Sequence, residues 1–126
     1  MNVAATPADN YEAMDDASFR AMVRDFVAQN CPPELMHLPR RVHWHEVKPW
    51  SMKLSARGWL APSWPKQYGG MGLSAGKQIA FVEEFDRAGV PRAPDMGIVM
   101  LGPLLIRFGT EEQKQKYLPR ILACED

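Results

Sequence analysis

The sequence has little of what marks secreted, membrane-spanning or nucleic-acid-binding proteins. Its two cysteines, Cys31 and Cys124, lie far apart in a chain with no secretory signal, which predicts reduced thiols. Fifteen basic residues balance fifteen acidic ones, so no net charge attracts nucleic acid or an anionic membrane. No apolar run approaches the roughly 18 residues of a membrane span. We therefore expect a cytoplasmic protein with no nucleic-acid partner and no membrane span.

Strand-like alternation, internal repeats and low-complexity tracts are also missing. The eleven prolines and nine glycines lie between segments of helical periodicity, where they separate helices. A chain of 126 residues fits one domain, which buries roughly two-thirds of the surface of its unfolded form. The predicted fold class is all-α, a small bundle of about five helices. We expect residues 1–14 to form a flexible leader and residues 15–126 the helical domain.

Apolar spacing predicts the first two helices, over residues 15–30 and 43–57. Asp15 or Asp16 is placed to cap the first, which ends before Cys31 because the residue preceding a proline disfavours helical geometry. Gly58 ends the second helix, whose start is open because Pro49 also suits a first helical turn. The aromatic-rich loop over 60–73 is expected to pack against the core.

A third helix is predicted from the Ser74 cap to Ala88, ended by Gly89. Its apolar face is expected to consist of Ile79, Val82 and Phe85, widened by Phe81. Glu83 is placed to pair with Arg87 across one turn, and Glu83 and Glu84 are interpreted as a solvated face.

The last quarter predicts two more helices. Residues 97–108 are apolar almost all round, so this helix should be buried on most sides. Gly109 is expected to close it in the left-handed conformation, and Thr110 with Gln113 has the spacing of a capping box for the next helix. Pro119 should kink or restart that helix. Its apolar face comprises Tyr117, Leu118, Ile121 and Leu122.

Two patterns suggest ligand sites but lack what those sites need. Residues 70–75 satisfy G-x-G-x-x-A, yet no strand precedes them, so a tight turn before a helix is favoured over dinucleotide binding. Zinc-binding residue types gather at Cys31, His37, His43, His45 and Glu46. A metalloprotease pattern would need histidine where Pro49 stands, and we predict no metal site.

Two blocks, GPLLIRFGTEEQKQKYLPRIL over 102–122 and GWLAPSWPKQYGG over 58–70, resemble the N-terminal helical domain of the acyl-CoA dehydrogenase family. The resemblance covers about Phe19 to Asp126. It implies an FAD-dependent oxidation of an acyl-CoA to the 2,3-enoyl-CoA, as in fatty-acid β-oxidation. It also implies that the carboxylate base and the main flavin-binding motif belong to the C-terminal and middle domains. We therefore expect no catalytic residue here, with Glu125 and Asp126 included, and no FAD binding by this chain alone.

The apolar segment over 96–106 is the candidate binding element. Met96 and Met100 lie one helical turn apart with Val99 beside them, and flexible thioethers suit an irregular apolar cavity. From the residues alone, ordinary core filling is favoured. The resemblance implies instead that Met96, Val99 and Met100 wall the acyl pocket, with Arg92 near its end.

Several alternatives stay open at this level. A non-catalytic helical subunit that docks on a flavin-bearing partner would have the same amphipathic helices, and acyl-CoA oxidases share the architecture. The resemblance implies a homo- or hetero-oligomer and acyl-CoA as the substrate. The length of the acyl chain, and whether it carries a ring, does not follow from these residues.

Overall fold

The structure, a computed structural model, describes residues 10–91 and 96–125. These residues form five α-helices and no strand: α1 (Asp16–Asn30), α2 (Trp44–Arg57), α3 (Ala75–Ala88), α4 (Gly102–Phe108) and α5 (Glu111–Leu122). Short helical turns lie between them, namely η2 (Tyr11–Ala13), η3 (Pro33–Leu35), η4 (Lys66–Tyr68) and the π-helical turn η5 (Gly97–Leu101). The all-α prediction is confirmed.

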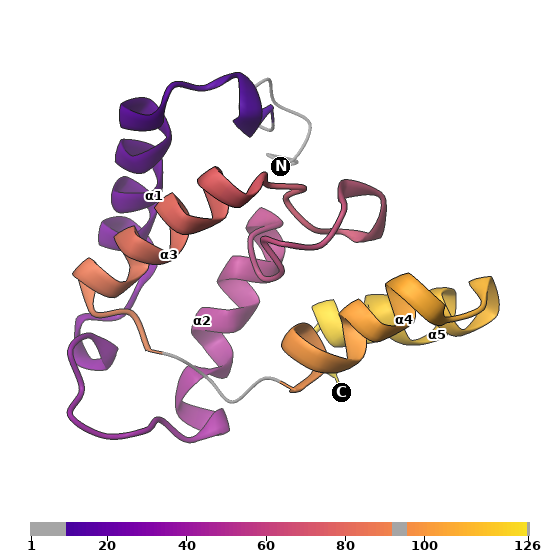
Figure 1. Ribbon diagram of the computed structural model, residues 1–126. Helices are drawn as coiled ribbons and strands as arrows, with labels where there is room; N and C mark the ends of the chain where they lie inside the picture. Colours follow the sequence, from indigo (N-terminus) through magenta and orange to yellow (C-terminus); the bar gives the residue numbers. More distant parts are fainter. Residues whose placement is uncertain (1–9, 92–95, 126) are drawn as a thin grey trace.

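Two cores hold these helices together. The larger core lies among α1, α2 and α3, where Phe19, Trp50, Trp59 and Phe81 are buried. The smaller core joins the loop after α2 to η5 and α5 through Ala61, Trp64, Ile98, Leu118 and Ile121. In Figure 1, η5, α4 and α5 accordingly form a separate arm beside the three larger helices.

Most predicted helix ends are confirmed. The side chains of Asp15, Ser74 and Thr110 accept hydrogen bonds from backbone N–H groups in the first turns of α1, α3 and α5. Gly58 and Gly89 end α2 and α3 with φ of 83° and 72°, the left-handed region that favours glycine.

Other local predictions are corrected. Gly109 has φ −75° and ψ 160°, so the chain leaves α4 extended and not left-handed. Helix α2 contains Pro49 in its interior, and α5 continues through Pro119 without restarting. Both cysteines are buried.

The predicted leader packs against the domain in part. Tyr11 is buried, and its hydroxyl accepts a hydrogen bond from Trp59 Nε1 at 2.8 Å. The Glu12 carboxylate accepts the backbone N–H of Ser74 at 2.9 Å. Residues 10–14 therefore belong to the folded unit, and residues 1–9 lie outside the described residues.

The predicted apolar face of α3 is confirmed in part, because Phe81 and Phe85 pack in the larger core but Ile79 and Val82 do not. Ile79 is 59% exposed and Val82 46% exposed, whereas Ala80, Phe81 and Glu84 are buried. The helix turns this way because α1 supplies partners that let Glu84 be buried.

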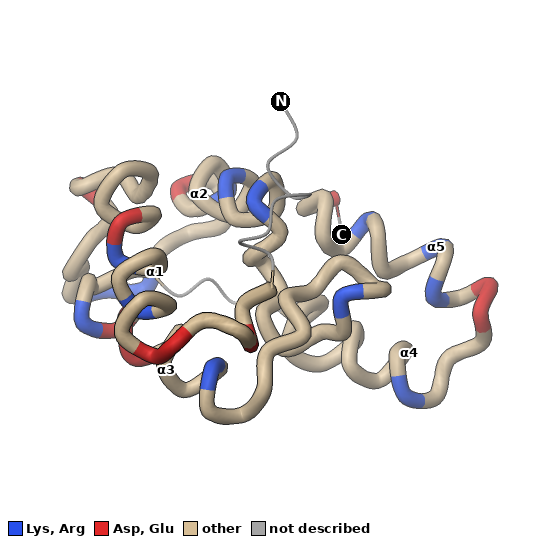
Figure 2. Tube along the Cα trace, turned by 90° about the horizontal axis from the view of Figure 1, so that it is seen from above, with Lys and Arg blue, Asp and Glu red and all other residues tan. Residues whose placement is uncertain are grey.

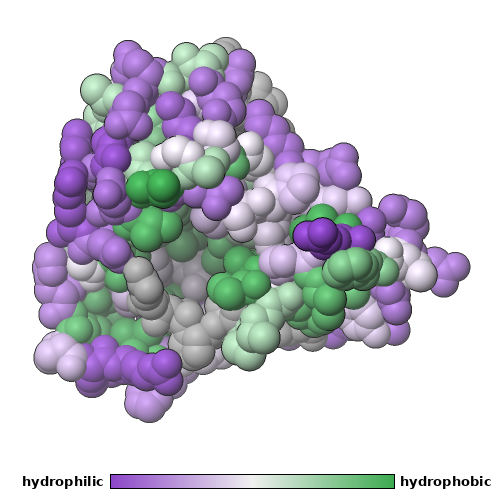
Figure 3. Space-filling model, viewed as in Figure 1, coloured by the Kyte–Doolittle hydropathy of each residue, from purple (hydrophilic) through white to green (hydrophobic). Residues whose placement is uncertain are grey.

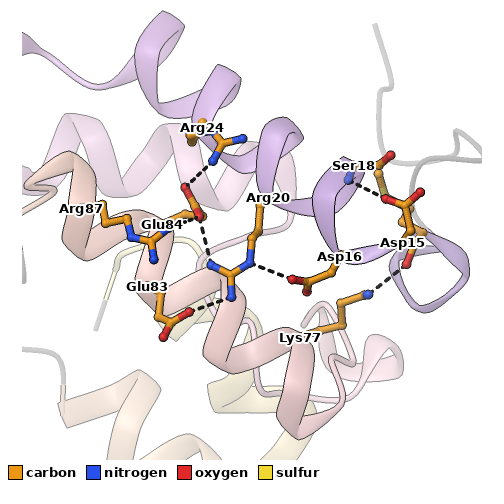
Figure 4. Close-up of polar contacts among 10 residues, drawn as sticks. Asp15, Asp16, Ser18, Arg20, Arg24, Lys77, Glu83, Glu84 and Arg87 are labelled. Carbon is orange, nitrogen blue, oxygen red and sulfur yellow. Dashed lines mark hydrogen bonds and ion pairs between the residues drawn. The ribbon is translucent and has the colours of Figure 1, made fainter.

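Glu84 is the centre of an ion-pair network between α1 and α3, drawn in Figure 4. Its carboxylate is 1% exposed and lies 3.0 Å from Arg20, 3.3 Å from Arg24 and 3.2 Å from Arg87. Arg20 also contacts Glu83 at 2.7 Å, so in place of the predicted pairing of Glu83 with Arg87, Glu83 pairs with α1 and Arg87 pairs with Glu84 on its own helix. A buried carboxylate is tolerated only when charge and hydrogen bonds compensate it, as they do here.

This network predicts unequal effects of two neighbouring substitutions. Glu84→Gln keeps the size of the side chain but leaves three guanidinium groups without their shared anion, so the free energy of unfolding should fall by about 2 kcal/mol. The matched change Glu83→Gln removes a half-exposed carboxylate and should cost less than about 1 kcal/mol. Urea unfolding followed by circular dichroism measures both, and equal losses would contradict the assigned role of Glu84.

Candidate functional site

The turn η5 and helix α4 form one uninterrupted helical segment with a change of hydrogen-bond register. The N–H of Gly102 bonds to the carbonyl of Gly97, five residues back, where an α-helix would use the fourth. Pro103 follows directly and has no N–H to donate, so it is compatible with the first turn of α4. The register change rotates the side chains before Gly102 relative to those after it.

Trp64 fixes the inner side of this segment. Its indole is 1% exposed, and Nε1 donates to the carbonyl of Ile98 at 3.1 Å. Gly102 lies so close that a Cβ at this position would overlap the Trp64 ring. Because one side of the segment is tied to Trp64 by packing and by a hydrogen bond, the opposite side has a defined direction.

That opposite side is apolar and uncovered. Its exposed fractions range from 42% at Leu101 to 74% at Phe108. We call this surface the outer apolar face, and it consists of Met96, Val99, Met100, Leu101, Leu104 and Phe108. The prediction that residues 97–108 are buried on most sides is therefore wrong. Ile98 and Gly102 are buried, Leu105 and Ile106 are half-buried against the smaller core, and the six side chains of the outer apolar face are exposed.

The outer apolar face contains three of the four predicted pocket residues. Met96, Val99 and Met100 share it, so ordinary filling of this domain's own core does not describe them. Arg92 lies outside the described residues.

Helix α5 supports the segment from behind. Leu118 and Ile121 are buried in the smaller core, with Leu122 half-buried beside them, as the predicted apolar face requires. The Ser55 hydroxyl of α2 donates to the carbonyl of Leu122, which joins this arm to the larger helices.

The glycine-rich pattern over 70–75 is a turn leading into α3. Ser74 accepts the N–H of Lys77 through its hydroxyl, and the N–H of Ser74 is bonded to Glu12. A carboxylate of this chain thus already occupies the helix N-terminus where a pyrophosphate would bind. The residues present do not fit a flavin or nicotinamide dinucleotide at this position.

The histidine-rich segment forms a helix start. Glu46 accepts the backbone N–H of His43 at 2.8 Å and pairs with Arg40 through both carboxylate oxygens. Hydrogen bonds from Arg40 and then from His43 lower the pKa of Glu46 to about 2. Among residues 10–91 and 96–125, no three His, Cys, Asp or Glu side chains converge as a metal site would require. No helix of these residues has the length and apolar character to cross a membrane.

Comparison with known proteins identifies the domain. A family model described as the acyl-CoA dehydrogenase N-terminal domain matches residues 14–125. The chain belongs to the acyl-CoA dehydrogenase family. It is similar to the acyl-CoA dehydrogenase IpdE1 of Mycobacterium tuberculosis, with 40% identity over 115 residues, which cover 85% of this chain and 30% of that protein.

Solved structures of acyl-CoA dehydrogenases have the same fold. The Tcur3481-Tcur3483 steroid ACAD aligns with a TM-score of 0.65 and 34% identity over 95% of this chain and 30% of that one. The ChsE4-ChsE5 complex from Mycobacterium tuberculosis aligns with a TM-score of 0.65 and 32% identity over 99% of this chain and 30% of that one. The chain thus spans about 30% of the length of these relatives and corresponds to their N-terminal helical domain.

The sequence reasoning missed the two residues that position the site. The sequence places Trp64 in a loop packed against the core and Gly102 at the start of the block that resembles the family, and it assigns neither residue a role at the site. A glycine inside an otherwise bulky helix is a usable signal, because it marks a place where another group approaches the backbone closely.

Two glycine substitutions test this packing. Gly102→Ala places a methyl group into the Trp64 ring and should lower the free energy of unfolding by about 2 kcal/mol. Gly76→Ala in α3 meets no atom within 4 Å and should leave stability unchanged or raise it by about 0.5 kcal/mol. Urea unfolding of the two variants provides the comparison, and a tolerated Gly102→Ala would refute the close packing of Trp64 on α4.

Proposed function

We propose that this domain supplies one wall of the acyl pocket of an FAD-dependent acyl-CoA dehydrogenase, which oxidises an acyl-CoA to the 2,3-enoyl-CoA. The observation that carries this proposal is the outer apolar face, held in a fixed direction by Trp64 on a domain of this family. Met96, Val99 and Met100 contact the acyl group, and Arg92 lies near the end of the pocket.

The chemistry of the outer apolar face suits an acyl chain. Its six side chains carry no charge, so they offer contact with methylene groups and exclude water. Contiguous exposed apolar residues on a folded domain mark binding or interaction surfaces. The methionine side chains adapt to the shape of what they contact.

The flavin and the catalytic base come from the rest of the enzyme. The glycine-rich turn before α3 does not fit a dinucleotide, and the relatives are about three times as long as this chain. This domain therefore binds and orients the acyl group but does not move protons or electrons itself. In the complete enzyme FAD accepts the electrons removed from the substrate.

The relatives suggest which substrates and assemblies to test. One solved structure is a steroid ACAD and another is a complex of two proteins, ChsE4 and ChsE5. We accordingly propose ring-bearing acyl-CoA thioesters beside straight-chain ones as substrates, and a homo- or hetero-oligomer as the complete form. A cytoplasmic location stays a prediction.

Flavin absorbance and the rate of acyl-CoA oxidation test whether the flavin and the catalytic base come from the other domains. The isolated 126-residue chain should show no flavin absorbance at about 450 nm and no oxidation of acyl-CoA, because the flavin site and the base belong to the other domains. A polypeptide that joins it to the middle and C-terminal domains, with any partner subunit, should show both. Turnover by the isolated chain would overturn the proposal.

A matched pair of substitutions tests the pocket wall in the complete enzyme. Met100→Gln puts an amide where the acyl chain is to be buried and should lower kcat/KM by about tenfold with flavin content unchanged. Met52 is similarly exposed, at 51% against 58% for Met100, but lies on α2, so Met52→Gln should leave kcat/KM unchanged. Equal kinetics for the two variants would contradict a pocket wall on η5.

A further inference from the structure

A second apolar feature, which shares no residue with the outer apolar face, lies beside α3. It is a cavity of about 150 Å³, open on one side. Its lining consists of Pro62, Phe81, Val82, Phe85, Val90 and Pro91, with Asp86 as the one charged residue. Phe81 and Phe85 also pack in the larger core, whereas Val82 is exposed, so α3 contributes both core and surface side chains to the lining.

The lining favours an apolar occupant over water. Six of the seven lining side chains contain only carbon and hydrogen, and Asp86 is exposed. The rings of Phe81 and Phe85 lie 4.4 Å apart and form a rigid aromatic wall. A water molecule needs two to four polar partners to be held in a cavity, and these side chains provide few. An apolar group that enters gains contact and displaces poorly bound water.

The cavity lies near the segment that carries the outer apolar face. Pro62 lines it, while the neighbouring Ala61 and Trp64 pack with Ile98 of η5 in the smaller core. Pro91 also lines it, and the five-residue step from Pro91 to Met96 spans at most about 18 Å. Figure 3 shows the surface hollowed between α3 and η5, with apolar residues on both sides of the hollow.

We propose that this cavity is a subsite for the far, apolar end of the acyl group, with room for about one six-membered ring. A cavity of roughly 150 Å³ lined by aliphatic and aromatic side chains accommodates one benzene molecule, which sets the size of the group. The proposal rests on the proposed function, because the outer apolar face must hold the part of the acyl group nearer the thioester. Val82 is then a residue that determines specificity for the acyl end.

Two substitutions on α3 separate this role from general effects on the helix. Val82→Phe fills the cavity with a ring. Because Val82 is 46% exposed, the larger side chain should be accommodated without unfolding the domain. Ile79→Phe is the matched control, because Ile79 is 59% exposed on the same helix, one turn earlier, and does not line the cavity. In the complete enzyme, Val82→Phe should lower kcat/KM for 6-cyclohexylhexanoyl-CoA about tenfold and leave hexanoyl-CoA unchanged. Ile79→Phe should alter neither.

A binding measurement on the 126-residue chain needs no catalysis. Benzene added to chain with labelled valine and isoleucine methyl groups should shift the NMR signals of Val82 and Val90 in a saturable way. It should leave the signal of Ile79 in place, and Val82→Phe should abolish the shift at Val90. Absence of a shift at Val82 and Val90, or equal shifts at Ile79, would overturn the subsite.

The two experiments distinguish the subsite from the proposed function. An enzyme that oxidises hexanoyl-CoA but shows no difference between Val82→Phe and Ile79→Phe would keep the function and remove the subsite. Saturable benzene binding with no acyl-CoA oxidation by the complete polypeptide would leave an apolar site here and refute the dehydrogenase function. Benzene binding together with the selective loss on 6-cyclohexylhexanoyl-CoA supports both.

Discussion

The contact between Trp64 and the segment formed by η5 and α4 is the constraint on which the candidate site depends. The indole ring lies against Gly102, and its N–H holds the carbonyl of Ile98. The other buried residues of the smaller core are Ala61, Leu118 and Ile121, and Leu105 and Ile106 of α4 pack against it on the same side of the segment as Ile98. Because Ile98 and Gly102 must face Trp64, Met96, Val99 and Met100 must face outward. One buried tryptophan therefore decides which side chains are available to a ligand.

The helices α1, α2 and α3 bury an apolar core among themselves, whereas η5 and α4 leave several of their apolar side chains exposed. Helices α1, α2 and α3 enclose their own aromatic core, and α1 and α3 are joined by the Glu84 network. Figure 2 shows charges of both signs along α1 and α3, and on the arm the charges lie mostly on α5, whereas α4 carries Arg107 as its charged residue. The arm leaves its outer apolar face uncovered. Such a surface is unfavourable in water and is expected where further protein or a substrate covers it. A domain that spans about 30% of its relatives fits this description.

Helix positions followed from the sequence because they depend on neighbouring residues. The caps at Asp15, Ser74 and Thr110 and the breaks at Gly58 and Gly89 need only local geometry, and the structure confirms them. The side of each helix that is buried depends on distant partners. Glu84 is buried because it pairs with Arg20 and Arg24, which lie 64 and 60 positions earlier in the chain, and no local pattern reveals such pairings.

The candidate site also combines features that the sequence shows with features that depend on distant residues. Its apolar composition and the methionine spacing were visible in the sequence, whereas its exposure was not. A helix that is apolar all round is ordinarily a buried one. This expectation fails for η5 and α4, because no described residue covers their outer side. The direction of the outer apolar face required the position of Trp64, and the cavity beside α3 required the packing of two loops against one helix.

Methionine oxidation tests most directly whether the outer apolar face is a surface that the complete enzyme covers. Dilute hydrogen peroxide followed by peptide mass spectrometry gives the rate at each methionine, and Met71, which is buried in this domain, serves as the slow reference. The account predicts that Met96 and Met100 are oxidised quickly in the isolated chain and at least about tenfold more slowly in the complete enzyme with bound acyl-CoA. Equal rates at Met96 and Met100 in the two forms would contradict it.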